Sequence, residues 1–111
     1  MTAPRLPDGC EAYRRLGPFT AATLPPGLLR AHALKPGCWG VLTIKAGGID
    51  FVWEDVPDRP IRLRVGDDVV IPPQRRHHIV VDSEFTLEIG LYRQSVSSVA
   101  TSPPPDLLPP P

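Results

Sequence analysis

The chain has 111 residues, with 12 basic and 12 acidic side chains, 16 prolines, 9 glycines and 41% hydrophobic residues. Because proline breaks a helix interior, this composition excludes a mostly helical fold, and the hydrophobic content with zero net charge excludes disorder throughout. There is neither the basic excess of a nucleic-acid-binding protein nor an apolar run near the roughly 20 residues of a membrane helix, so we expect one domain with no nucleic-acid partner and no membrane span.

The two ends of the chain differ in composition from the middle. Residues 1–12 hold prolines and no apolar stretch of a signal peptide, so we expect a flexible N-terminus and a cytoplasmic protein. In that compartment Cys10 and Cys38 would be free thiols. Six prolines fall in the last nine residues, which predicts a disordered proline-rich tail over 95–111. The folding unit is then 13–94, and a metal or a homodimer would help to stabilise so small a core.

Strand and turn signals follow one another at short intervals along this folding unit. We expect one helical turn within 23–30, with Pro26 near its start, and strands at 13–19, 39–46, 49–54, 61–65, 69–71, 77–81 and 85–92. The strand over 39–46 is apolar at consecutive positions, which predicts burial on both faces, and Gly47-Gly48 reads as the turn that follows it. Short strands joined by turns predict an all-β barrel or sandwich.

A block from Gly66 to His77 has a spacing that can present a metal ligand. Gly66 turns the chain into a short apolar strand, Pro72-Pro73 ends its hydrogen-bonding ladder, and a tight turn then presents His77. His78 would point to the opposite face of that strand. The block resembles the second conserved motif of cupins, whose histidine faces the barrel lumen and binds a metal.

A second block lies upstream, where His32 precedes a strand that ends at Gly47. The layout is that of the first cupin motif, but the usual His-x-His pair and glutamate are replaced by His-x-x-Lys-x-Gly-x-Trp-Gly. Together with Phe19-Thr20 and Tyr92-Arg93, this variant resembles the TehB/YeaR-like family, small cupin-type domains associated with tellurite resistance proteins. The resemblance implies an all-β, cupin-like double-stranded β-helix (jelly-roll) barrel with one short helical turn.

The resemblance also implies a divalent transition metal, with zinc or iron as the expected ion. His32 and His77 match the family's histidines and are the expected ligands, with His78 a weaker candidate. The family's acid on the last strand falls at Gly90 here, which is a departure. Glu88 lies two residues earlier on the same strand face, so it is either the third ligand or a surface glutamate.

The last strand also suggests which residues line the lumen. Over 85–92, small or polar residues that include Glu88 and Tyr92 alternate with an apolar set. We expect the polar face to line the lumen and the apolar face to pack or to form a dimer. Lys35 could neutralise an anionic ligand or be solvated surface. Trp39 and Tyr92 complete the candidate ligand-binding residues, although a tryptophan here could equally be core.

Two classes of function remain open. One is a metal-dependent enzyme that acts on a small anionic or oxidised molecule, and the intact His77 block favours it. The other is a non-catalytic small-molecule-binding or sensing module, with or without a metal, which the missing second histidine and Gly90 favour. By resemblance, the role would be tolerance of tellurite, another toxic oxyanion or a stress metabolite. A folding unit of about 80 residues is too small for a methyltransferase domain.

Overall fold

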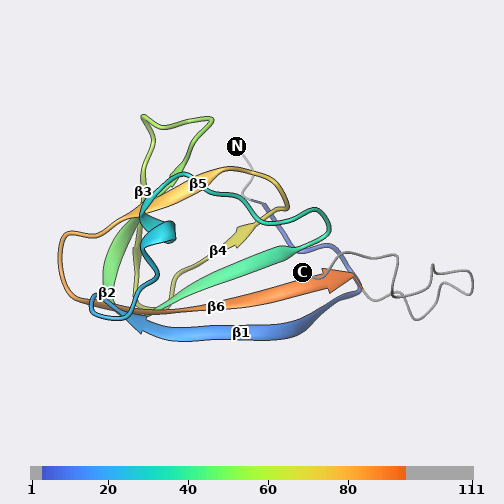
Figure 1. Ribbon diagram of the computed structural model, residues 1–111, viewed down its shortest axis with the longest axis horizontal. Coiled ribbons are helices and arrows are strands. Elements are labelled where there is room, and N and C mark those ends of the chain that lie inside the picture. The colour runs from blue at the N-terminus through green and yellow to red at the C-terminus, as the bar shows by residue number, and fades with distance from the viewer. Residues whose placement is uncertain (1–3, 95–111) are drawn as a thin grey trace, which may run out of the picture.

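The computed structural model describes residues 4–94. Six antiparallel strands and one turn of 3-10 helix form there (Figure 1): β1 (Cys10–Thr20), η1 (Pro26–Leu29), β2 (Trp39–Trp53), β3 (Ile61–Arg64), β4 (Asp68–Ile71), β5 (His77–Val80) and β6 (Phe85–Gln94). The expected all-β fold with one short helical turn is confirmed. No helix in this range is long and apolar enough to cross a membrane.

The first strand begins earlier than expected. β1 starts at Cys10, three residues before the expected domain boundary at Tyr13, because Cys10 pairs with Gln94 at the end of β6. Residues 10–12 are therefore strand rather than part of a flexible N-terminus. The expected tail over 95–111 lies outside the described residues.

The long strand β2 connects the two layers of the fold. Its first half pairs with β6 and β4, and its second half pairs with β3 and β5 (Figure 1). The expected turn at Gly47-Gly48 is therefore wrong, because the chain continues as a strand. Gly47 has φ 67°, and a Cβ there would collide with the carbonyl oxygen of Glu84. Glycine allows β2 to bend while it stays paired.

The hydrophobic core lies between the two layers. Along β2 the core side chains change from even positions in the first half to odd positions in the second. An irregularity in the pairing with β6, between Ile44 and Ala46, shifts the register, and so both halves of β2 face inward. The segment 39–46 is thus buried on one face only, not on both as expected. The core cluster is Leu42, Ile44, Ile49, Phe51, Trp53, Leu63, Val69, Ile71, Ile79, Phe85, Leu87 and Ile89.

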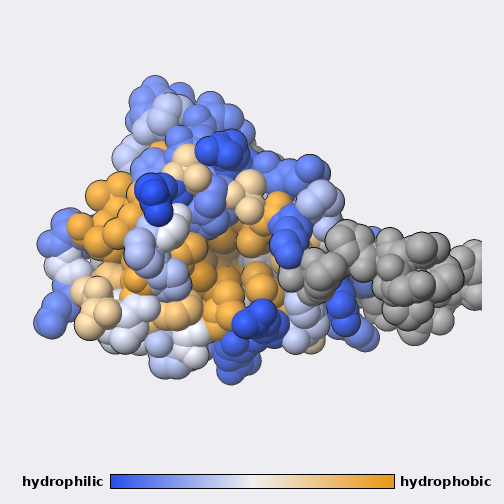
Figure 2. Space-filling view, in the orientation of Figure 1, coloured by the Kyte–Doolittle hydropathy of each residue, from blue (hydrophilic) through white to orange (hydrophobic). Residues whose placement is uncertain are grey.

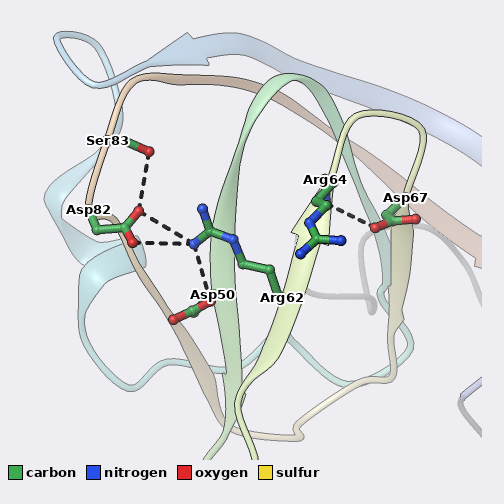
Figure 3. Close-up of polar contacts among 6 residues, drawn as sticks. All are labelled: Asp50, Arg62, Arg64, Asp67, Asp82 and Ser83. Carbon is green, nitrogen blue, oxygen red and sulfur yellow. Dashed lines mark hydrogen bonds and ion pairs between the residues drawn. The ribbon is translucent and has the colours of Figure 1, made fainter.

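On the outside of the β3–β2–β5 layer, Arg62 joins three segments (Figure 3). Its Nη1 lies 3.3 Å from Oδ1 of Asp50 in β2 and 3.4 Å from both carboxylate oxygens of Asp82, in the loop before β6. Nearby, the backbone N–H of Arg64 donates to Oδ2 of Asp67 at 2.9 Å and closes the β3–β4 turn. Because these side chains are partly exposed to solvent, the ion pairs contribute little to the stability of the fold.

Candidate functional site

His32 and His77 meet at the end of the core. His32 follows η1 and forms an isolated bridge with His77, the first residue of β5. The N–H of His32 donates to the carbonyl of His77 at 3.0 Å, and the reverse hydrogen bond measures 2.9 Å. The imidazole centroids lie 4.2 Å apart with the ring planes at 60°. The structure therefore brings the two expected metal ligands into contact.

The ring of His77 is enclosed by aromatic side chains. Its centroid lies 5.3 Å from that of Phe51 in a near-parallel stack and 5.8 Å from that of Trp53, which it meets edge-on. Only 2% of His77 is exposed. Burial disfavours the charged imidazolium, and the electrostatic interaction with the neighbouring His32 adds to this, so the pKa of His77 falls from 6.5 to about 4. His77 is therefore neutral at physiological pH.

Both imidazoles are oriented by a backbone carbonyl two residues earlier in the chain. Nδ1 of His32 lies 3.0 Å from the carbonyl oxygen of Arg30, and Nδ1 of His77 lies 2.9 Å from that of Arg75. A carbonyl only accepts, so in each neutral ring Nδ1 carries the proton and Nε2 keeps its lone pair. Within residues 4–94 no hydrogen bond engages either Nε2. These are the atoms that a ligand or a metal would meet.

His32 also lines an apolar pocket of about 240 Å³ where β1, η1 and β6 come together. The other lining residues are Leu16, Phe19, Pro25, Gly27, Leu28 and Ile89. Figure 2 shows hydrophobic residues gathered in the opening between the layer that holds β1 and β6 and the layer that holds β5. The lining exposes only apolar atoms, so the pocket can receive an apolar body, and His32 contributes ring carbon rather than a polar contact.

This pocket was not foreseen from the sequence, although a signal for it was present. Leu16 and Phe19 are partly buried among the exposed residues of β1, and Leu28 is partly buried against the core from η1. Apolar side chains are that signal, but only the fold shows that they leave a hollow beside His32.

Glu88 does not join the histidine pair. The buried side chains of β6 are Phe85, Leu87 and Ile89, so Glu88 faces outward from the layer. The expectation that the polar face of 85–92 lines the lumen is therefore corrected. The apolar face lines it, because removing three large apolar side chains from water is more favourable than enclosing a carboxylate.

The other histidine of the motif has a different partner. His78 points away from His77, as strand alternation predicts, and its Nδ1 contacts Oε2 of Glu54. The adjacent Arg75 is also engaged, because it pairs with Asp55 at 3.1 Å and its guanidinium lies 3.9 Å from the ring centroid of Trp53. Sequence spacing did not reveal these partners, which come from the end of β2 and the residues that follow it.

The three candidate ligand-binding residues lie at the end of the barrel where β2 begins. Lys35 is exposed in the turn before β2, where its carbonyl accepts the N–H of Cys38 at 3.0 Å. Trp39 begins β2 and is half-buried opposite Tyr92 of β6. Because Leu42 faces the core, the odd positions of this part of β2 face outward, and Trp39 and Tyr92 share the outer face of the layer.

The donor set does not complete a transition-metal site. Catalytic zinc and non-haem iron take three protein ligands. The two imidazoles fit such an ion in type and in tautomer, because each Nδ1 is held by a carbonyl. Across residues 4–94, however, no three His, Cys, Asp or Glu side chains are grouped so as to hold a metal. The third ligand expected at Glu88 is not supplied.

Comparisons with known proteins place this geometry in a family. A family model described as the TehB-like domain matches residues 14–89. A solved protein of Escherichia coli K12 is 21% identical with a TM-score of 0.74, over 83% of this chain and 98% of that chain. TehB from Haemophilus influenzae is 19% identical with a TM-score of 0.71, over 86% of this chain and 36% of that chain. These likenesses show the shared fold. No curated protein sequence matches the chain significantly.

Proposed function

The chain belongs to the TehB-like domain family, and from that premise we propose that it is a non-catalytic domain that binds a small molecule beside His32. The observation that carries the proposal is the apolar pocket of about 240 Å³ with the His32 imidazole in its wall. The ligand lies with its apolar body against this lining, to which His32 contributes ring carbon.

The chemistry of the histidine pair favours binding over proton transfer. A general base works best when its pKa lies near the working pH. The pKa of His77 is lowered to about 4 by burial, so it is a weak base at neutral pH. Its stack on Phe51 and its hydrogen bonds with His32 instead support the wall of the pocket.

The biological role that we propose is tolerance of a stress metabolite. The family resemblance implies tellurite, another toxic oxyanion or a stress metabolite as the target. Among these, the pocket favours a neutral organic molecule, because moving a bare oxyanion from water into an apolar lining is costly.

Two neutral probes and one oxyanion test this proposal by nuclear magnetic resonance. Toluene should cause saturable shifts at the amides of Leu28, His32 and Ile89, and phenol, whose hydroxyl would find no partner in the apolar lining, should bind more weakly. Leu28→Ala, which removes part of the lining, should weaken toluene binding, while the control His78→Gln should leave it unchanged. Absence of saturable shifts with either probe, or shifts at these amides with tellurite alone, would overturn the proposal.

A divalent transition metal held by His32 and His77 is the second candidate. The carbonyls that orient both Nδ1 atoms favour it, since this is the usual support of metal-binding histidines. Elemental analysis of the purified protein should then find zinc or iron close to one per chain, and His77→Gln should remove it. A correctly folded protein that takes up no metal would eliminate this candidate.

A further inference from the structure

A second hollow lies on the outer face of the layer formed by β1, β6 and the first half of β2. Its volume is about 170 Å³, and its lining residues are Arg15, Val41, Thr43, Lys45, Glu88, Gly90 and Tyr92. None of these residues lines the pocket beside His32. At roughly 30 Å³ per water molecule, the hollow has room for a ligand of several heavy atoms. We call it the outer groove.

The outer groove lies beside Gly90, where the middle strand of this layer has no side chain. The strand register places Arg15 of β1 on one side of Gly90 and Val41 of β2 on the other. The ring of Tyr92 leans over the gap, with Cε1 3.1 Å and Oη 3.7 Å from the position that a Cβ on Gly90 would take. Glu88, two residues further along the same face, bounds the groove at its other end.

Three charged side chains share this small groove without neutralising one another. Arg15 and Lys45 are exposed and Glu88 is half-buried. In the part of the chain that the structure describes, neither cation forms an ion pair with Glu88. The carboxylate of Glu88 would repel a ligand that carries only negative charge. Arg15 and Lys45 would repel a ligand that carries only positive charge. A ligand that carries one positive and one negative charge can pair with all three side chains.

We propose that the outer groove binds a small zwitterion of the amino-acid type. Its carboxylate lies toward Arg15 and Lys45, and its ammonium group lies toward Glu88, so that each contact is a charge-assisted hydrogen bond. The hydroxyl groups of Thr43 and Tyr92 supply further polar contacts at the groove. This site is separate from the pocket beside His32 and does not depend on its ligand.

Three small probes distinguish a zwitterionic ligand from an anionic or a cationic one: L-alanine, acetate and methylammonium. We expect L-alanine to cause saturable shifts at the amides of Thr43 and Gly90, and acetate and methylammonium to bind about tenfold more weakly. Glu88→Gln and Arg15→Gln should each weaken L-alanine binding by a similar factor. The matched controls, Glu84→Gln and Arg14→Gln, should leave it unchanged.

Three results would contradict the proposal of a zwitterion site. Acetate binding as tightly as L-alanine would make the groove an anion site and overturn the proposal. So would equal losses in the variant and control proteins, or shifts with L-alanine that do not saturate. Toluene shifts at Leu28 report on the other pocket, so failure at the outer groove is distinguishable from failure of the proposed function.

Discussion

The ring of Tyr92 lies over Gly90, with its Cε1 3.1 Å from the position that a Cβ on Gly90 would take. An aromatic side chain that covers a strand glycine in this way compensates for the missing packing surface. The resemblance placed an acid of the family at position 90, and here a glycine and the ring of Tyr92 take its place. The exchange is local to the outer face of β6 and leaves its buried face unchanged.

A double-mutant cycle measures this contact. Alanine normally stabilises a strand relative to glycine by about 0.5–1 kcal/mol, but in the native protein the added methyl group would press against the ring of Tyr92. We expect Gly90→Ala to give no gain in the native protein and a gain of that size in the Tyr92→Ala background. Urea unfolding should then show a coupling of about 1 kcal/mol. Additive effects would mean that the ring does not cover Gly90.

The bend of β2 predicts that alanine substitution at two glycines has very different effects on stability. Gly47→Ala would place a Cβ against the carbonyl oxygen of Glu84 at a positive φ, so we expect a loss of about 3 kcal/mol in the free energy of unfolding, or no folded protein. Gly27→Ala is the matched control, because a Cβ there meets nothing within 4 Å. Its effect should stay within about 0.5 kcal/mol in the same measurement. Equal effects would contradict the bend.

The buried imidazole of His77 predicts a dependence of stability on pH. Above pH 6.5 the ring is neutral in both the folded and unfolded states and contributes no pH dependence. Below pH 6.5 the unfolded chain takes up a proton that the folded protein resists until about pH 4, since burial lowers the pKa of His77 to about 4. Between these pH values the free energy of unfolding should fall by about 3 kcal/mol.

Unfolding followed in urea at several pH values checks this dependence, and the titration of the His77 ring can be read directly by nuclear magnetic resonance. His77→Gln should remove most of the loss between pH 6.5 and pH 4, whereas His78→Gln should preserve it. Asp55, whose pKa is lowered by its hydrogen bond with Arg75, acts only below that window. A ring that titrates near pH 6.5 would show that His77 is solvated.

The ion pairs of Arg62 predict a small stabilisation that depends on salt. Arg62 reaches Asp50 and Asp82 at the surface, where ions screen the attraction (Figure 3). Arg62→Ala should lower the melting temperature slightly at low ionic strength and have little effect in about 1 M sodium chloride, where the screening length is roughly 3 Å. Arg59→Ala, at another exposed arginine, should show no such salt dependence.

Local sequence chemistry determined the elements of this fold. Proline content excluded helices, Pro26 marked η1, and period-two patterns located most strands to within a few residues. The spacing of the Gly66–His77 block placed His77 at the start of β5 with its side chain buried, and His78 on the opposite face. These features depend on backbone conformation and on strand alternation, which neighbouring residues set by themselves.

Tertiary structure determined the features that the local sequence pattern could not predict. Gly47-Gly48 reads as a turn, yet pairing with strands on both sides keeps β2 continuous, because a paired strand satisfies more backbone groups than a turn. Glu88 was expected inside, but alternation along β6 fixes only which residues share a face, not which face is buried. That choice depends on the summed burial of Phe85, Leu87 and Ile89 against the opposite layer, an energy that exists only once the layers have packed.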